Sequence, residues 1–246
     1  MLLNCDLGES YGSWKMGMDD QVMPFIDQAN IACGFHGGDP LTIRNTLSLA
    51  RQNDVTVGAH PAYPDLVGFG RRSMKLSTDE LSAALLYQIS ALDGMARSEG
   101  LELQYVKPHG ALYNDMMANT DIRSVIMDTL AGYYRPLSLL VQATPNADKH
   151  REEAKDRKIN IQFEAFADRC YDTDGALLPR NKAGAVHGKE KMLAQVIQLR
   201  DSGTVTNVDG DKLALTADTL CVHGDNLEGV NAIQEIRALL SSPTAR

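Results

Sequence analysis

The sequence is poor in cysteine, with 4 in 246 residues, and no two of them form a Cys-x-x-Cys pair. This excludes paired-cysteine zinc and redox motifs, and the count and spacing do not suit the disulfide framework of a secreted protein. Three of the four, Cys5, Cys33 and Cys221, lie inside apolar segments that resemble strands. We therefore expect buried thiols rather than metal ligands or nucleophiles.

Long apolar runs and an excess of positive charge are missing as well. No run approaches the roughly 18 apolar residues that a membrane span requires. The first strand-like segment begins almost at Met1, which leaves no room for a signal peptide. With 24 basic and 32 acidic residues the net charge is −8, which argues against binding to a nucleic-acid backbone. We expect a cytoplasmic protein with no membrane span and no nucleic-acid partner.

Several nucleotide-binding and hydrolase motifs are absent. The segment from Gly184 to Lys189 is one residue short of a Walker A loop, and Glu190 follows where serine or threonine is required. Residues 68–73, Gly-Phe-Gly-Arg-Arg-Ser, lack the third glycine of a dinucleotide-binding fingerprint. Neither His-Glu-x-x-His nor Gly-x-Ser-x-Gly occurs, so the zincin and α/β-hydrolase classes are excluded.

The order of the apolar and amphipathic segments predicts an α/β fold. Short apolar segments alternate with helical patterns, and strands separated by helices form parallel βαβ units. Ser77 to Glu80 has the form of a capping box, and Asp39 with Pro40 provides an N-cap and a first-turn proline. The predicted strands are residues 2–6, 30–36, 55–60, 104–109, 136–141, 159–166 and 219–223, and the predicted helices are residues 41–52, 78–98, 120–130, 148–156, 189–201 and 228–240.

The length fits one β/α barrel or two small domains, since barrels of roughly 200–250 residues are common. No linker indicates two domains, so we predict a single barrel domain over residues 1–246. With 43% hydrophobic residues the chain can bury a sizeable core. Asp209-Gly210 within the alternating segment 204–216 predicts a β-hairpin beside the barrel. Two long insertions, residues 61–76 and 168–188, are interpreted either as mobile covers over a site or as plain surface loops.

Six of the seven predicted strands run into a cluster of polar or ionisable residues. Because the carboxyl ends of parallel strands meet at one face of a barrel, we expect these clusters to converge on one pocket, as in an enzyme. Side chains two apart on a strand point the same way, as for Asn4 with Asp6 and Lys107 with His109. The clusters are residues 4–9, 33–39, 60–65, 107–114, 164–169 and 221–225.

Histidines form the strongest part of this pattern. His36, His60 and His109 each follow a different predicted strand, beside glycine or proline. Glycine lets the backbone approach a ligand closely, which favours a functional site over a structural one. By contrast, His150 and His187 lie in polar stretches and are expected to be solvated.

Several acidic residues carry two interpretations. Asp6 and Glu9 are candidates for a general base or metal ligands, or for a helix cap. Asp225 either joins the site or caps the last helix. Asp168 and Arg169 either contribute to the site or form a structural salt bridge.

Lys107 is the most informative single residue. A lysine on the inward face of a strand is costly to bury unless it pairs with a carboxylate, stabilises an oxyanion or phosphate, or loses its proton to become a nucleophile. We therefore expect Lys107 to have an acidic partner.

The same stretches of sequence resemble the LamB/YcsF family, from the start of the chain to near residue 226. One departure is Gly37, where alanine is expected, and the change is predicted to be harmless. The matching stretches are Asn-Cys-Asp-Leu-Gly-Glu at 4–9, Cys-Gly-Phe-His-Gly-Gly-Asp-Pro at 33–40, Gly-Ala-His-Pro at 58–61, Val-Lys-Pro-His-Gly-Ala-Leu-Tyr-Asn at 106–114, Glu-Ala-Phe-Ala-Asp-Arg at 164–169 and Val-His-Gly-Asp at 222–225.

The resemblance implies a seven-stranded variant of the TIM-like β/α barrel, similar to the glycoside hydrolase and polysaccharide deacetylase group. It also implies an ATP-dependent 5-oxoprolinase, an amide hydrolase that opens the lactam of 5-oxoproline to L-glutamate together with two further subunits, B and C. ATP is the implied cofactor, and the presence of a divalent metal is left open.

Lactam hydrolysis needs a base to direct water, cations to hold oxyanions and a proton donor for the departing nitrogen. We assign Asp6 or Glu164 as the base and Lys107 as the group that stabilises an oxyanion or phosphate. The acid donors or metal ligands are assigned to His36, His60, His109 and His223, and the substrate carboxylate to Arg71, Arg169 or Arg180. The predicted site has Asp6, Lys107, His109, Glu164 and His223 as catalytic residues and Asn4, Glu9, His36, Asp39, His60, Asn114, Asp168, Arg169 and Asp225 as substrate-binding residues.

Two other functions stay open on the sequence alone. One is a metal-dependent, deacetylase-like hydrolase in which Asp6 and two histidines hold Zn²⁺ or Mn²⁺. The absence of a His-x-x-x-His pair weakens that interpretation. The other is a non-catalytic subunit that binds the lactam and presents it to partners holding ATP. The missing phosphate loop favours this second function, and the many ionisable groups at strand ends do not.

Overall fold

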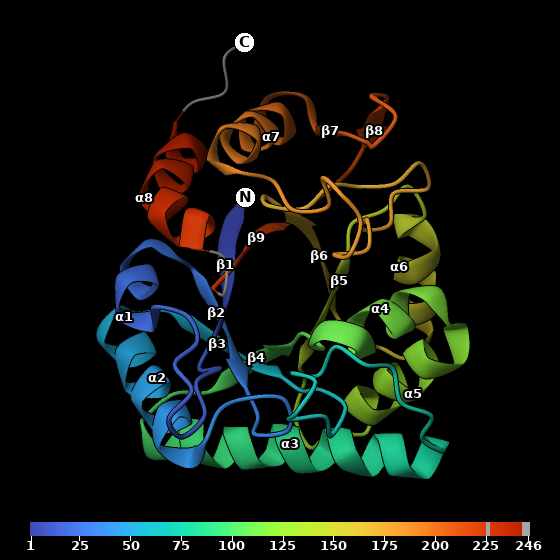
Figure 1. Ribbon diagram of the computed structural model, residues 1–246. Helices are drawn as coiled ribbons and strands as arrows, with labels where there is room; N and C mark the ends of the chain where they lie inside the picture. Colours follow the sequence, from blue (N-terminus) through green and yellow to red (C-terminus); the bar gives the residue numbers. More distant parts are fainter. Residues whose placement is uncertain (225–226, 243–246) are drawn as a thin grey trace.

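A closed barrel of seven parallel strands forms the centre of the molecule (Figure 1). The computed structural model describes residues 1–224 and 227–242. The strands follow one another around the ring in sequence order, and the last one closes it against the first. This confirms the predicted seven-stranded TIM-like barrel. The strands are β1 Leu2–Leu7, β2 Gln28–Ala32, β3 Thr56–His60, β4 Leu103–Val106, β5 Ser138–Gln142, β6 Ile161–Phe166 and β9 Thr219–His223.

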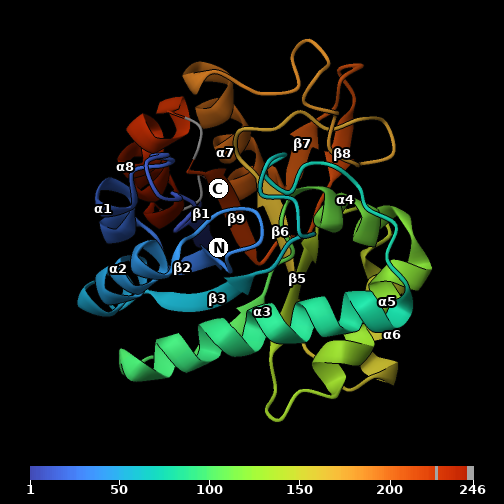
Figure 2. The ribbon, with the colours of Figure 1, turned by 60° about the horizontal axis from the view of Figure 1, so that its bottom comes forward.

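Helices surround the barrel and connect its strands. Figure 1 shows α1 and α2 on one side of the barrel and α4, α5 and α6 on the other, and Figure 2 shows the long α3 crossing beneath the strands. The helices are α1 Asp19–Val22, the 3₁₀ helix η1 Met23–Phe25, α2 Pro40–Gln52, α3 Thr78–Ser98, α4 Gly110–Ala118, α5 Thr120–Ala131, α6 Ala147–Asp156, α7 Lys189–Ser202 and α8 Leu227–Ser241. Across the described ranges, no helix is both long enough and apolar enough to cross a bilayer.

Two helix starts and a hairpin follow local sequence signals. Ser77 and Glu80 form a reciprocal capping box at the start of α3, as predicted. Asp39 accepts hydrogen bonds from the backbone of Leu41 and Thr42 at the start of α2. The strands β7 Thr204–Thr206 and β8 Lys212–Ala214 pair antiparallel on either side of Asp209-Gly210.

Two predicted strands end earlier than expected, and the short helices α1 and η1 and the helix α4 were missed. β2 ends at Ala32 rather than His36, because Gly34 and Gly38 have φ values of +89° and +81° that interrupt an extended chain. β4 ends at Val106, just before Lys107 and Pro108. Helix α4, residues 110–118, begins directly after His109 at Gly110, and a glycine at this position carries little helical signal.

Polar side chains of β1 face the interior of this barrel, and its apolar side chains face the surrounding helices. Leu3, Cys5 and Leu7 of β1 are buried in the core cluster shared with the helices. Asn4 and Asp6 alternate with them and therefore face the interior of the ring. Barrel interiors are normally filled by branched apolar residues, whereas buried polar groups need hydrogen-bond partners. Polar side chains inside this barrel therefore indicate a functional site rather than a purely structural core.

All four cysteines are buried and free, which confirms the predicted burial of Cys5, Cys33 and Cys221. Burial raises the pKa of Cys5 and of Cys221 well above the ordinary thiol value, and it raises the pKa of Cys33 to about 12. Each of these three thiols therefore stays protonated at neutral pH and is a poor nucleophile.

Gly58 allows the Tyr105 ring to lie inside the barrel. A Cβ atom built on Gly58 would overlap the ring of Tyr105, whose hydroxyl donates to Asn30 at 2.8 Å. We expect Gly58→Ala to lower the free energy of unfolding by about 1–3 kcal/mol, because the ring must move out of its hydrogen bond. Gly94→Ala, on the exposed face of α3 with no atom within 4 Å of the new Cβ, should instead stabilise by about 0.5–1 kcal/mol. Urea unfolding of both variants measures the difference, and equal midpoints would contradict the expectation.

Candidate active site

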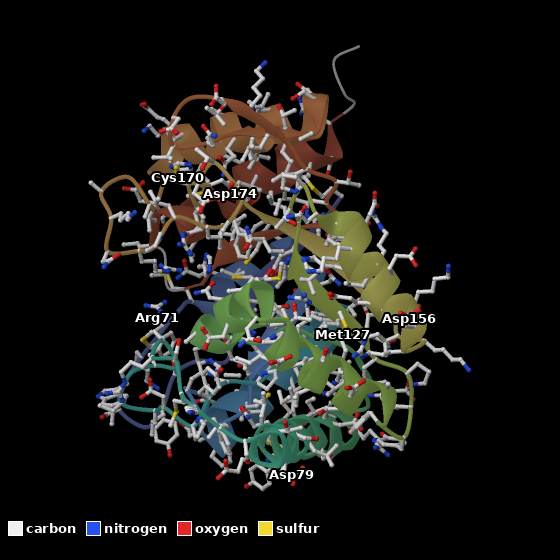
Figure 3. All side chains as sticks on the ribbon, turned by 90° about the vertical axis from the view of Figure 1, so that its right-hand side faces the viewer. Arg71, Asp79, Met127, Asp156, Cys170 and Asp174 are labelled. Atoms are coloured by element: carbon white, nitrogen blue, oxygen red, sulfur yellow. The ribbon has the colours of Figure 1, made fainter. Side chains whose placement is uncertain are left out.

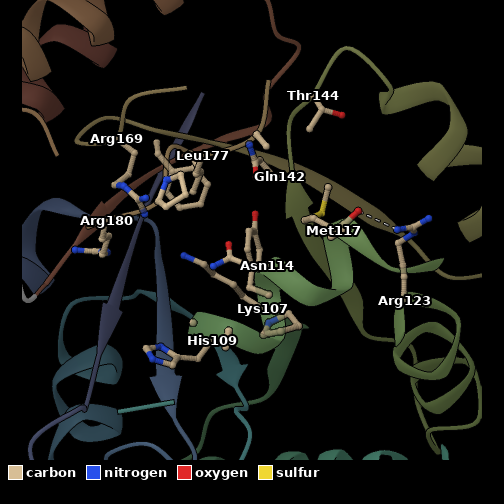
Figure 4. Close-up of a pocket in the computed structure, with 18 of the residues that line it drawn as sticks. Lys107, His109, Asn114, Met117, Arg123, Gln142, Thr144, Arg169, Leu177 and Arg180 are labelled. Carbon is tan, nitrogen blue, oxygen red and sulfur yellow. Dashed lines mark hydrogen bonds between the residues drawn. The ribbon is translucent and has the colours of Figure 1, made fainter. Parts of the chain in front are cut away.

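A cavity of about 720 Å³ opens beside the carboxyl ends of the strands. This volume falls within the roughly 300–1,000 Å³ of small-molecule sites. Figure 4 shows Arg169 and Arg180 on one side of the cavity and Arg123 and Thr144 on the other. Arg71 from the loop after β3 and Asp174 from the loop after β6 also line the cavity. In Figure 3 both residues lie to the left of Asp156, which is on the far right of the molecule.

Lys107 and Asp6 form a buried ion pair at this cavity. The Lys107 ammonium donates to Asp6 Oδ1 at 2.8 Å, and the two residues are 2% and 6% exposed. Burial alone would lower the pKa of Lys107, but the charges of Asp6 and Glu164 outweigh it and raise this pKa well above its usual value. Burial raises the pKa of Asp6, but His60 and Lys107 hold it well below its usual value. The predicted acidic partner is present, and Lys107 is an ammonium ion rather than a free amine.

A hydrogen-bond network inside the ring holds this pair in place. Asn30 Nδ2 donates to Asp6 Oδ1 at 2.7 Å and to Asn4 Oδ1 at 2.8 Å. Asn4 in turn donates to Thr219 Oγ1 at 2.9 Å, and the Tyr105 hydroxyl donates to Asn30. Asn4 therefore supports the ion pair through Asn30 and does not line the cavity.

Glu164 lies against Lys107 from the interior of the barrel. Its Oε2 is 3.1 Å from Lys107 Nζ, and the residue is fully buried. Since Glu164 is not among the residues that line the cavity, only Asp6 of the two predicted bases faces the space where a substrate would lie. Glu164 is therefore a second carboxylate beside Lys107, placed behind the cavity wall.

Glu9 and His36 meet one layer behind the cavity wall. His36 Nε2 lies 3.0 Å from Glu9 Oε1. Burial lowers the pKa of His36 to about 3, so the contact is a hydrogen bond from a neutral ring rather than an ion pair. A Cβ on Gly37 would lie 2.6 Å from the Glu9 carbonyl oxygen. The glycine at this position was predicted to be a harmless departure, and in this chain an alanine there would require the backbone to shift.

His60 and His109 lie side by side where β3 and β4 end. His60 Nε2 is 3.0 Å from His109 Nδ1 and 3.4 Å from Asp6 Oδ2. His109 Nδ1 is also 3.3 Å from Glu9 Oε1. The residues Glu9, His36, His60 and His109 each offer a ligand atom within 4.8 Å of the others, and this buried His/Glu cluster could bind a divalent metal.

His223 at the end of β9 pairs with Asp168. Its Nδ1 lies 3.0 Å from Asp168 Oδ1, and a carboxylate can only accept, so Nδ1 carries the proton and Nε2 is left to exchange protons. His223 lines the cavity, whereas Asp168 is fully buried behind it. An imidazole held in this way can donate or accept a proton at Nε2.

Arg169 and Arg180 place two positive charges at one wall of the cavity. Burial and the charge of Arg180 lower the pKa of Arg169 to about 10. Arg169 donates to the backbone oxygens of Leu178 at 2.6 Å and Ala185 at 3.3 Å. Across residues 1–224 and 227–242, neither Arg169 nor Arg180 has an ion-pair partner. Adjacent guanidinium groups without a carboxylate suit an anionic ligand.

The predicted site residues thus divide into three groups. Asp6, His60, Lys107, His109, Asn114, Arg169 and His223 line the cavity. Asn4, Glu9, His36, Glu164 and Asp168 support these residues from behind. Asp39 does neither: its carboxylate caps α2 and accepts from Gly12, so we leave it out of the site. Asp225 lies outside the described residues.

Sequence reasoning missed part of the cavity wall. His150 was predicted to be solvated, but it is 5% exposed and lines the cavity from α6, because this face of the helix packs against the barrel. His187 is half-buried rather than solvated. Gln142 also lines the cavity, and a polar residue ending the apolar run of β5 was the signal that could have found it.

Comparisons with known proteins agree with this architecture. The model of the LamB/YcsF family matches residues 1–246. The chain is 50% identical over 246 residues to a 5-oxoprolinase subunit of Pseudomonas fluorescens, covering all of this chain and 98% of that protein. It is 52% identical over 237 residues to a 5-oxoprolinase subunit of Chromohalobacter salexigens, covering 96% and 95% of the two chains. The crystal structure of a lactam utilization protein from Thermus thermophilus matches with a TM-score of 0.88 and 39% identity, covering 98% and 95%.

Proposed function

The chain belongs to the LamB/YcsF family, and we propose that it is one subunit of an ATP-dependent hydrolase that opens the lactam of 5-oxoproline to L-glutamate. The relatives named as subunits of 5-oxoprolinase, together with the lactam utilization protein, support this substrate. The observation that carries the proposal is the buried Lys107–Asp6 pair at one cavity with His60, His109 and His223.

The ion pair supplies the charges that lactam opening needs. A lactam carbonyl is a poor electrophile, and negative charge develops on its oxygen when water adds to the ring carbon. The Lys107 ammonium is placed to stabilise this charge in a site from which water is largely excluded. Asp6, ionised and facing the cavity, is placed to take the proton of the attacking water.

His223 is placed to protonate the nitrogen that leaves when the ring opens. When the ring C–N bond breaks, the departing nitrogen takes up a proton. His223, held by Asp168, can deliver that proton from Nε2. Asp168 acts through His223 and is therefore a positioning residue.

ATP would make the carbonyl reactive. Transfer of the γ-phosphoryl group to the lactam oxygen would release ADP, and two waters, one for ring opening and one for release of phosphate, would complete the conversion to L-glutamate. In that case the Lys107 ammonium would stabilise the phosphoryl oxygens rather than a free oxyanion. The cavity is larger than one lactam requires, and Arg169 and Arg180 offer positive charge to a carboxylate or a phosphate.

We expect Arg180→Gln to raise the KM for 5-oxoproline about 10- to 100-fold, with a smaller change in kcat. A hydrogen bond to a charged group contributes about 1.5–3 kcal/mol, and this one would act on the bound substrate carboxylate throughout the reaction. Steady-state kinetics in the complete enzyme measure both constants. Arg44→Gln, an exposed arginine of α2 outside the cavity, is the control. An unchanged KM in Arg180→Gln would remove this arginine from the substrate site.

The role of this chain within the enzyme is tested by leaving out one component at a time. This chain and its two partner subunits are combined with 5-oxoproline and ATP, and glutamate and ADP are measured. The proposal predicts that both products depend on this chain. Turnover by the isolated chain without ATP would favour the metal-dependent hydrolase instead. Full turnover by the partners alone would overturn the proposal.

A further inference from the structure

The backbone fixes the protonation of two neighbouring imidazoles. His60 Nδ1 lies 2.6 Å from the carbonyl oxygen of Lys107, and His109 Nε2 lies 2.9 Å from the carbonyl oxygen of Phe69. A carbonyl oxygen can only accept, so both of these nitrogens carry their hydrogens. In the neutral rings, the remaining nitrogens are His60 Nε2 and His109 Nδ1, and each has a lone pair and no hydrogen.

These two lone pairs face each other. The distance from His60 Nε2 to His109 Nδ1 is 3.0 Å, short enough for a hydrogen bond that neither neutral ring can donate. Two acceptors at this distance repel each other unless a cation lies between or beside them. The residues are 1% and 4% exposed, so water screens the contact little.

Other donor atoms surround the same point. Glu9 Oε1 is 3.3 Å from His109 Nδ1 and 3.0 Å from His36 Nε2, and Asp6 Oδ2 is 3.4 Å from His60 Nε2. Ligands at about 2.0–2.1 Å from a tetrahedral ion are separated from one another by about 3.3 Å. The spacing of these donors is therefore that of a coordination shell.

The ring nitrogens of His60 and His109 that face away from this point make the hydrogen bonds typical of metal-binding histidines. Histidines that bind a metal donate their other ring N–H to a backbone carbonyl or carboxylate, which fixes the tautomer and the ring orientation. His60 and His109 both do so, through Lys107 and Phe69. The rings of His36 and His109 are stacked with centroids 3.7 Å apart and an interplanar angle of 4°, so they lie in separate parallel planes and only His109 can direct a nitrogen at the ion.

We propose that His60 Nε2, His109 Nδ1 and Glu9 Oε1 form a binding site for one divalent transition-metal ion, and that His36 holds Glu9 in place by donating its Nε2 hydrogen to this carboxylate. Imidazole-rich sites favour Zn²⁺ and its transition-metal neighbours over Mg²⁺ or Ca²⁺, which prefer oxygen ligands. His60, His109 and Asp6 also line the cavity, so the ion would lie at its wall. There it would act as a Lewis acid toward a carbonyl or phosphoryl oxygen.

Metal analysis of the full chain tests the proposal independently of lactam hydrolysis. The protein is made without a histidine tag, dialysed against a chelator and then against Zn²⁺ or Mn²⁺, and bound metal is measured by mass spectrometry. We expect one Zn²⁺ per chain. His60→Gln/His109→Gln should bind at least about 100-fold more weakly, beyond the roughly 10- to 100-fold cost of losing a supporting partner. His150→Gln, which removes another buried histidine of the cavity, should bind as the wild type does.

A second measurement covers the case in which the double variant fails to fold, as judged by circular dichroism. Wild-type protein loaded with Co²⁺ should show visible absorption of a nitrogen-bound ion, and the folded Glu9→Gln variant should shift it. Nuclear magnetic resonance of the imidazole nitrogens then shows whether His60 or His109 instead carries a hydrogen on both ring nitrogens. The absence of a bound ion together with a doubly protonated ring at His60 or His109 would overturn the proposal, as would equal Zn²⁺ binding by wild type and double variant.

Discussion

Lys107→Met lowers kcat/KM for 5-oxoproline by at least about 10³-fold in the complete enzyme. Loss of one preorganised donor to an oxyanion costs about 10²–10³-fold, and this variant also removes the charge that orients Asp6. The free energy of unfolding should fall by about 3–5 kcal/mol, because breaking a buried ion pair leaves a carboxylate without its cation. Kinetics and urea unfolding measure the two effects.

A paired variant separates catalysis from folding. Lys107→Met/Glu164→Gln removes one of the two carboxylates that face Lys107, so it should recover part of the lost stability, with Asp6 still lacking its cation. It should not recover activity, because no ammonium remains at the cavity. Lys155→Met, an exposed lysine of α6 outside the cavity, should leave both quantities near wild type. Turnover near wild type in the folded double variant would show that Lys107 has only a structural role.

Asp6→Asn should lower kcat by roughly 10²–10⁴-fold, the range expected when a general base is lost. The amide keeps the size of the carboxylate, but it carries no charge for Lys107 and has little basicity. The KM should change less than kcat, since Asp6 is proposed to act on water rather than on the lactam. Steady-state measurements in the complete enzyme give both constants.

Asp93→Asn is the matched control for this variant. Asp93 is also a buried carboxylate paired with a cation, since its Oδ1 lies 2.7 Å from Arg135, but it lies outside the cavity. Its replacement should cost stability and leave kcat near wild type. If Asp6→Asn loses no more kcat than Asp93→Asn, the base is not Asp6.

The sequence predicted the barrel and the convergence of its strand ends for a physical reason. Parallel strands separated by helices can close only one way, and polar residues placed two apart at strand ends must face inward. Asp6 and Lys107 therefore meet although 101 positions separate them in the chain. The need of a buried lysine for a carboxylate predicted an acidic partner, but not which of Asp6 and Glu164 faces the cavity.

The remaining details depend on three-dimensional packing that spacing alone does not contain. Asp39 was assigned to the substrate, but a residue before Pro40 also fits a helix cap, and the cap is what forms. His150 has polar neighbours in the sequence, and only the docking of α6 buries it. Likewise, the facing nitrogens of His60 and His109 depend on which ring atom meets a carbonyl.

Titration of the isolated chain with 5-oxoproline, in the presence and absence of ATP, tests most directly whether the strand ends form one lactam site. Calorimetry should find one lactam bound per folded chain. Binding should weaken in Arg180→Gln and be lost in Lys107→Met/Glu164→Gln. No lactam binding to the wild-type chain under either condition, or undiminished binding in both variants, would show that the lactam is handled elsewhere.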